Sequence, residues 1–124
     1  MPVRGIDHVQ LAMPAGGDAQ ARAFYTGVLG LPERAKPPHL AKPGGCWFEC
    51  GALQLHLGVE PAFQPARKAH PGLLVDDLPG LLAALRTAGC DVTFDEPIDG
   101  FERAFTADPF GNRLELLEPR RTGP

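Results

Sequence analysis

Three histidines and one glutamate occupy related places in the chain: His8, His56, His70 and Glu115. Each lies in a stretch whose side chains alternate between apolar and polar, which is typical of a β-strand with one buried face. In each stretch the histidine or glutamate falls on the face opposite the one that we expect the helices to cover. Neutral imidazoles and carboxylates are ligands of Fe, Zn, Ni, Co and Mn ions. The pattern therefore predicts a site for one divalent metal ion.

Each of these four residues also has an ordinary explanation. A single histidine in a strand is more often a half-buried, hydrogen-bonded side chain than a metal ligand. The metal site is favoured by the repeated placement and by Glu115, whose mid-strand carboxylate is costly to bury unless a cation meets it. His8, His70 and Glu115 alone would form a two-histidine, one-carboxylate set with positions open for a substrate. Glu115 is also the candidate catalytic group.

Five further side chains are predicted to contact a substrate near this face: Arg103, Arg113, Gln10, Gln54 and Trp47. The arginines could bind an anionic group bidentately, although surface ion pairs with Glu102 or Glu118 are an equal alternative. The glutamines could handle a proton through a water molecule. The tryptophan could line a pocket, with core packing as its alternative.

The elements that must position these residues form two similar halves. In the first half we expect strands at 3–13, 46–50 and 52–59, a helix near 19–29 and a short edge strand within 31–45. In the second half we expect strands at 69–75, 90–95, 101–106 and 113–118, and a helix from Asp76 or Asp77 to about Ala88. Both halves read β-α-β-β-β.

The offsets between the halves support an internal repeat. His8 and His70 are 70 − 8 = 62 positions apart, and His56 and Glu115 are 115 − 56 = 59 positions apart. A half of about 60 residues is marginal as an independent fold. We therefore expect a single α+β domain of residues 1–124 built from two βαβββ modules, at about 1–60 and 68–119, whose sheets can join into one larger curved sheet. Pairing of modules within one chain and exchange of modules between two chains both remain open.

Composition excludes several function classes. The chain has 124 residues, 44% hydrophobic and 22% charged, as in ordinary globular proteins. A net charge of −3 and a pI of about 5.7 give no basic footprint, so we expect no nucleic-acid partner. No apolar run is long enough to span a membrane, and the polar start MPVRGIDH does not resemble a signal peptide. Three cysteines without an export signal are best explained as reduced thiols in a cytoplasmic protein.

Four segments together carry a family resemblance. They are Gly5-Ile6-Asp7-His8-Val9, Phe24-Tyr25-Thr26-Gly27-Val28-Leu29-Gly30-Leu31, Ala69-His70-Pro71-Gly72-Leu73-Leu74-Val75-Asp76 and Asp108-Pro109-Phe110-Gly111-Asn112-Arg113-Leu114-Glu115. Over essentially the whole chain, this layout resembles the vicinal oxygen chelate superfamily. That superfamily includes glyoxalase I, fosfomycin-resistance thiol transferases, extradiol dioxygenases and bleomycin-resistance proteins.

The resemblance implies paired βαβββ modules in a cup-shaped mixed sheet with helices on the outer face, a metal ion in the cup and commonly a homodimer. It places His8, His70 and Glu115 at metal-ligand positions. His56 falls where glyoxalase I has a ligand carboxylate, so only one glutamate of that enzyme's pair is present here.

The function implied is that of a metal-dependent enzyme acting on a small oxygenated, anionic molecule that chelates the metal. Proton-transfer chemistry of the lyase or isomerase type ranks first, ring-cleaving dioxygenase chemistry second and thiol transfer third. The alternative is a bleomycin-resistance-like protein that binds a ligand without catalysis.

Overall fold

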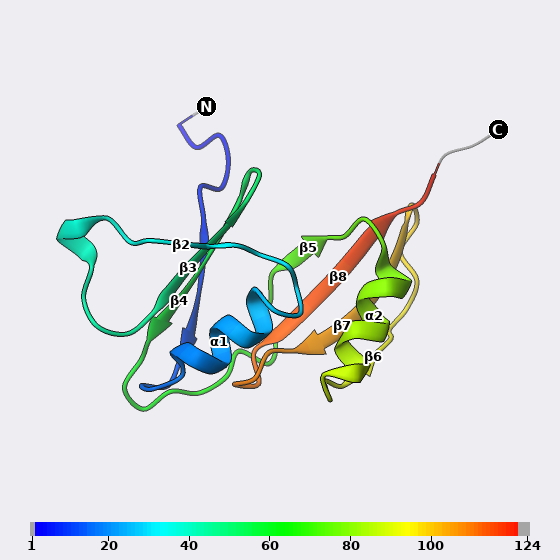
Figure 1. Ribbon diagram of the computed structural model, residues 1–124. Coiled ribbons are helices and arrows are strands. Elements are labelled where there is room, and N and C mark those ends of the chain that lie inside the picture. Colours follow the sequence, from blue (N-terminus) through cyan, green and yellow to red (C-terminus); the bar gives the residue numbers. More distant parts are fainter. Residues whose placement is uncertain (1, 122–124) are drawn as a thin grey trace. The chain divides into compact units, whose positions relative to one another are not determined.

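The computed structural model describes residues 2–121 and divides the chain into two compact units, with the boundary between Gln64 and Pro65 (Figure 1). Each unit contains one α-helix and one open, four-stranded mixed sheet. The α+β fold class predicted from the sequence is confirmed.

The first unit is a βαβββ module. Its elements are β1 (Val9–Met13), α1 (Asp18–Tyr25), β2 (Glu33–Arg34), a short 3₁₀ helix (Pro38–Leu40), β3 (Cys46–Cys50) and β4 (Leu53–Val59). The strand order is β1-β4-β3-β2, with β1 parallel to β4 and the other pairs antiparallel. The short edge strand expected within residues 31–45 is β2.

The second unit repeats this topology. Its elements are β5 (Gly72–Leu74), α2 (Leu78–Thr87), β6 (Val92–Thr93), β7 (Phe101–Ala107) and β8 (Arg113–Pro119). The strand order is β5-β8-β7-β6, again with the first and last strands parallel. The internal repeat inferred from residue spacing is therefore a repeat of strand pairing as well.

In each unit the apolar strand face is buried against the helix. In the first unit the buried strand residues are Leu11, Met13, Cys46, Phe48, Leu55 and Leu57, and the helix contributes Ala21, Phe24 and Tyr25. The Tyr25 ring stacks on Phe48 with 5.4 Å between centroids. In the second unit the buried set is Leu73, Ala104, Leu114 and Leu116 from the strands, and Leu78, Leu82 and Leu85 from the helix. This leaves the opposite face of each sheet to the predicted site residues.

Several elements are shorter than their sequence pattern predicts. β1 begins at Val9, because its parallel partner β4 pairs with it only from Leu55 onward. Helix α1 spans Asp18–Tyr25, four residues short of the end expected at 29, and its N-cap is Gly17. A Cβ at Gly27 would lie 2.3 Å from the Ala23 carbonyl oxygen, so the chain tightens there in a way that only glycine allows.

Two carboxylates accept hydrogen bonds from the first amides of helix α2. Asp77 is the N-cap, and its Oδ1 accepts a hydrogen bond from the Gly80 amide at 3.2 Å. Glu118, from β8, accepts from the Leu78 amide at 2.8 Å. Both contacts satisfy amides that have no partner within the helix and place negative charge at its positive end.

The turn between β7 and β8 is a buried polar cluster built by Asp108 and Asn112. Asp108 Oδ1 accepts from the amides of Phe110 and Asn112, each at 2.9 Å, and Asp108 Oδ2 accepts from Asn112 Nδ2 at 2.9 Å. Asn112 Oδ1 in turn accepts from the Ala66 amide at 3.0 Å. The turn therefore fastens the start of the second unit to the start of β8.

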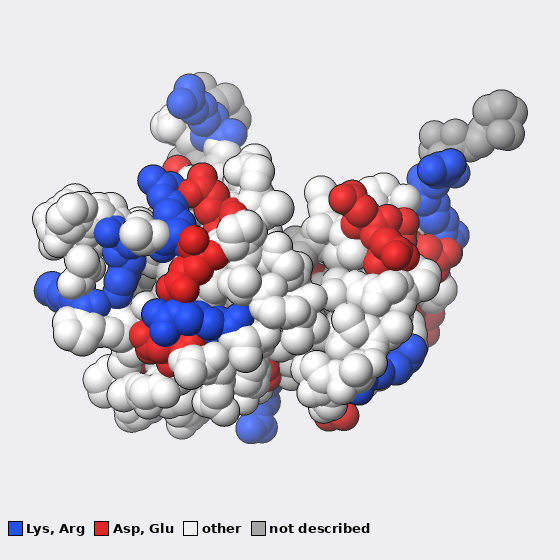
Figure 2. Space-filling model, viewed as in Figure 1, with Lys and Arg blue, Asp and Glu red and all other residues white. Residues whose placement is uncertain are grey.

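Acidic and basic side chains are interleaved over the first unit on the face seen in Figure 2. Two ion pairs of the first unit are Arg22 with Glu33 and Arg34 with Glu49, each at 2.8 Å. In residues 2–121, no helix is long and apolar enough to cross a membrane.

Replacing Asn112 by alanine tests the role of the turn. The change leaves the Ala66 amide without its acceptor and removes the Asn112 donor to Asp108, so we expect a loss of about 2–4 kcal/mol in the free energy of unfolding. Urea denaturation measures it. The matched control is Gln20→Ala, which removes an exposed amide from α1 and should change stability by less than about 0.5 kcal/mol. Equal effects of the two substitutions would contradict a structural role for Asn112.

Candidate metal and substrate site

In the second unit, Glu115 is a buried carboxylate held from two sides. Its Oε1 lies 2.9 Å from His70 Nε2, and its Oε2 accepts from Arg103 Nη1 at 3.1 Å. The Glu115 side chain is 12% exposed and that of Arg103 is 14% exposed. Arg103 also donates from Nε and Nη2 to the Glu96 carbonyl. Arg103 therefore supplies a cation for the mid-strand Glu115 carboxylate, as the sequence analysis expected for a buried charge.

The tautomer of His70 follows from its second contact. Nδ1 lies 2.9 Å from the carbonyl oxygen of Lys68, which can only accept, so Nδ1 carries a proton. In the neutral ring Nε2 then bears a lone pair, and that lone pair faces a carboxylate oxygen. Two acceptors at 2.9 Å require either a proton shared between them or a cation bound to both. A histidine whose Nδ1 is held by a carbonyl and whose Nε2 faces a carboxylate fits a metal ligand.

The ionised state of Glu115 also fits the role of a metal ligand. Burial alone would raise its pKa, but the hydrogen bonds from His70 and Arg103 outweigh burial, and the pKa lies below the ordinary value of 4.5. Glu115 is therefore ionised at neutral pH.

In the first unit the polar face carries a stack of three rings. His56 is paired with Trp47 across β3 and β4, and their rings are parallel within 2° with 4.1 Å between centroids. His8 stacks on the other side of His56 at 4.6 Å and 18°. His56 is only 5% exposed as a result. Burial, together with the nearby His8, lowers the pKa of His56 below 6.5, so its ring is neutral at pH 7.

His8 shares one feature with His70. Its Nδ1 lies 3.0 Å from the Asp7 carboxylate, which accepts the proton and leaves the lone pair of the neutral ring on Nε2. In both units the first predicted ligand histidine is thus oriented by an oxygen on Nδ1. This contact is the kind that orients metal-bound histidines.

The remaining predicted contacts lie on the same sheet faces. Gln10 pairs in register with His56 and lies against Gly58, where a Cβ would be 2.6 Å from its Nε2. Gln54 is two residues before His56 and so shares its face. Neither arginine pairs with Glu102 or Glu118, the alternative raised by the sequence; Glu102 pairs instead with Arg120, at 3.0 Å.

Phe105 is a site residue that the sequence analysis did not select. It is paired with Glu115 across β7 and β8, as Trp47 is with His56, and its ring lies edge-on to His70 at 5.7 Å. The guanidinium carbon of Arg113 is 4.1 Å from its ring centroid and that of Arg103 is 5.2 Å away. Its position two residues after Arg103 was the available signal, because both must share one strand face.

Neither unit by itself gathers, within residues 2–121, three His, Cys, Asp or Glu side chains that could hold a metal. Each contributes a pair: His8 with His56, and His70 with Glu115.

This fold and these residue pairs define the class of protein. Residues 5–116 match the model of the Glyoxalase/Bleomycin resistance protein/Dioxygenase superfamily, and the chain belongs to that superfamily. The resemblance seen in the sequence is therefore confirmed. A search of curated proteins gives no significant match.

Solved structures with the same fold include members with different roles. A protein assigned to the glyoxalase family from Bacillus anthracis is 43% identical, with a TM-score of 0.89 and coverage of 95% of this chain and 97% of that chain. The fosfomycin resistance protein FosX from Listeria monocytogenes, in complex with Mn(II) and sulfate, is 13% identical, with a TM-score of 0.75 and coverage of 95% and 92%. The antibiotic-binding protein TnmS3 from Streptomyces sp. CB03234 is 22% identical, with a TM-score of 0.69 and coverage of 97% and 99%.

The lowered pKa of His56 predicts how stability changes with pH. The unfolded chain takes up a proton at this residue near pH 6.5, while the folded chain resists it. The contribution of His56 to folding is therefore fully present above pH 6.5 and is lost as pH falls through the lower folded pKa. In chelator-treated protein, we expect His56→Phe to flatten the decline in the free energy of unfolding below pH 6.5.

Urea denaturation at a series of pH values measures this slope. The control is His39→Gln, because His39 is exposed in the 3₁₀ helix and lies outside the stack. Its profile should parallel that of the unsubstituted protein. A His56→Phe profile that also runs parallel would show that His56 does not titrate as its burial requires.

Proposed function

We propose that the chain is a metal-dependent, glyoxalase-like enzyme in which His8, His56, His70 and Glu115 together hold one divalent ion. The observation that carries the proposal is the contact between His70 Nε2 and Glu115 Oε1, two potential ligand atoms that lie 2.9 Å apart. The donor set of imidazoles and one carboxylate suits Fe, Zn, Ni, Co or Mn. FosX, which has the same fold, was crystallised with Mn(II), and this supports a divalent ion.

The proposal requires the polar faces of two modules to share the ion. Two modules of one chain satisfy this requirement, and so do modules exchanged between two chains. The assembly we propose is a homodimer. We also propose a cytoplasmic location, since free thiols at Cys46, Cys50 and Cys90 are typical of reducing compartments.

The substrate proposed is a small, oxygenated, anionic metabolite. When bound, the ion would supply Lewis-acid stabilisation of negative charge that develops on adjacent substrate oxygens. Glu115, ionised at neutral pH, would accept or return a proton. Gln10 and Gln54 would orient a water, and Trp47 would border the substrate. The reaction proposed first is lyase- or isomerase-type proton transfer, and dioxygenase chemistry second.

Arg103 and Arg113 would contact the substrate's anionic group. Arg113 is the freer of the two, because Arg103 already donates to Glu115 and to the Glu96 carbonyl.

The second candidate is a ligand-binding protein without catalysis. It is favoured by the absence of a three-ligand group within either unit in residues 2–121, and by the antibiotic-binding protein TnmS3 having this fold. Such a protein needs no metal, so metal content separates the two functions.

Elemental analysis of protein purified without an affinity tag tests the proposal. We expect about one divalent metal per chain, and its loss in His70→Ala and Glu115→Gln with unchanged circular dichroism. The control is His39→Ala, which removes an exposed imidazole outside the predicted set and should retain the metal. Metal-free protein under all conditions, or equal loss in the control, would favour the binding protein.

A further inference from the structure

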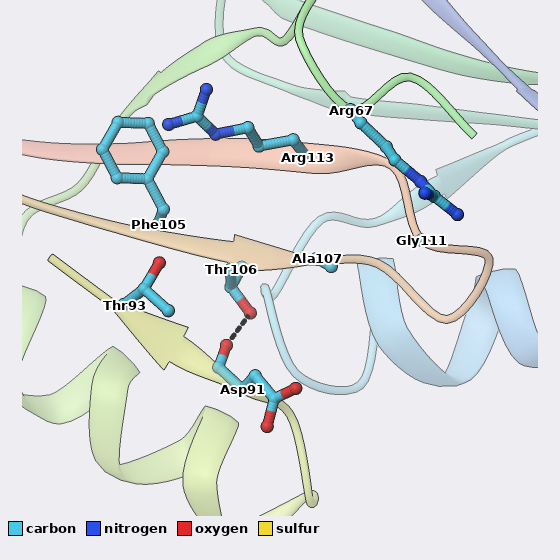
Figure 3. Close-up of a pocket in the computed structure, with 8 residues that line it drawn as sticks. All are labelled: Arg67, Asp91, Thr93, Phe105, Thr106, Ala107, Gly111 and Arg113. Carbon is cyan, nitrogen blue, oxygen red and sulfur yellow. Dashed lines mark hydrogen bonds between the residues drawn. The ribbon is translucent and has the colours of Figure 1, made fainter. Parts of the chain in front are cut away.

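A hollow of about 220 Å³ lies in the second unit, over the ends of β7 and β8 (Figure 3). Arg67, Thr93, Phe105, Gly111 and Arg113 border it, together with Asp91. It is small for a ligand pocket, so its occupant would be a small molecule or one end of a larger one.

The Arg113 guanidinium is held by stacking, but no carboxylate of residues 2–121 pairs with its charge. Its guanidinium lies over the Phe105 ring, 4.1 Å from the centroid, and this stacking fixes its plane. It forms no ion pair with any carboxylate of residues 2–121. An arginine held flat on an aromatic ring with its N–H edge unpaired is arranged to receive a planar or tetrahedral oxyanion.

Arg67 supplies a second positive charge from a segment that is held in place. The Ala66 carbonyl accepts from the Arg113 amide at 2.8 Å, and the Ala66 amide donates to Asn112 Oδ1 at 3.0 Å. Gly111 has a φ of +93°, and a Cβ there would lie 3.2 Å from Pro65. The backbone before Arg67 therefore packs against the turn, and Figure 3 shows the side chains of Arg67 and Arg113 on the same side of β7.

Asp91 does not cancel these charges. Its backbone carbonyl accepts from Thr106 Oγ1 at 2.7 Å, and in Figure 3 its carboxylate lies on the far side of β7 from both arginines. Two guanidinium groups and one carboxylate border the hollow, so its formal charge is positive. The Thr93 hydroxyl adds a neutral donor at its edge.

We propose that this hollow binds the anionic group of a small carboxylate, phosphonate or phosphate, with Arg113 as the direct donor and Arg67 as the second cation. Arg113 and Glu115 lie on one face of β8, about 7 Å apart along the strand. The identification of the occupant as the substrate rests on the proposed function, and it then names the substrate class: a compact acid whose anion and reactive oxygens lie only a few bonds apart.

Titration of metal-free, chelator-dialysed protein tests the proposal. The probes are inorganic phosphate, methylphosphonate and acetate, at constant ionic strength set with chloride, and the readout is amide and arginine Nε–H shifts in NMR spectra. We expect saturable shifts at Arg113, Thr93 and Phe105. Shifts that never saturate, or that spread over the basic residues outside the hollow, would overturn it.

Three substitutions sharpen the test. Arg113→Gln should weaken binding by about tenfold or more, and Arg67→Gln by a smaller factor. Arg113→Lys should retain only part of the affinity, because lysine keeps the charge but not the planar fork. Arg86→Gln is the matched control: Arg86 is exposed in the last turn of α2 and does not border the hollow, so its affinity should be unchanged. Equal affinity in Arg113→Gln and Arg86→Gln would contradict the proposal.

The metal content of the same variants, measured before the chelator dialysis, separates this inference from the proposed function. Anion binding lost in Arg113→Gln with metal retained supports both. Anion binding in a protein that never holds metal overturns the enzyme and leaves an anion-binding site. Metal retained in a protein that binds none of the three anions overturns the hollow alone.

Discussion

The structure of the second unit depends on how one buried carboxylate is kept in mid-strand. Glu115 stands between Leu114 and Leu116, both fully buried, on a strand paired on both sides. An isolated carboxylate there would be strongly unfavourable. His70 and Arg103 offset that penalty, and the arginine is itself fixed by the Glu96 carbonyl. Removing Arg103 would leave the buried carboxylate without its arginine, and the contacts of Glu115 with His70 and Arg103 join β8 to β7 and to the segment before β5.

The internal repeat shows how the two modules treat equivalent positions differently. Strand register matches Trp47–His56 of the first module with Phe105–Glu115 of the second. The first module covers its polar face with stacked rings, and the second with a charged network. Yet burial keeps His56 neutral and hydrogen bonding keeps Glu115 ionised. Both are the protonation states in which these groups bind metals, so different local physics leads to compatible chemistry.

The sequence predicted the faces of the strands better than their ends. Side chains alternate strictly along a strand, so Leu55 and Leu57 must be buried together while His56 faces the other way. Where a strand stops depends on its partner, which the local pattern does not contain. His8 and His70 therefore lie one and two residues before β1 and β5, although both were predicted within strands. Helix α1 likewise ends at Tyr25, and the chain turns just beyond it at Gly27, where there is no room for a Cβ beside the Ala23 carbonyl.

The candidate site shows the same division between local and nonlocal information. Arg103 and Arg113 were recognised, but their partners were not, since Glu96 lies on the connection before β7 and Phe105 looks like a core residue by type. The segment Asp108-Pro109-Phe110-Gly111-Asn112 entered the sequence analysis only through the family resemblance. Its Asn112 also binds Ala66, forty-six residues earlier in the chain, and so fixes the backbone that carries Arg67. A single buried amide thus joins the stability of the β7–β8 turn to the placement of a cation beside the site. That coupling explains why a turn motif with no reactive group lies directly before the strand that carries Glu115.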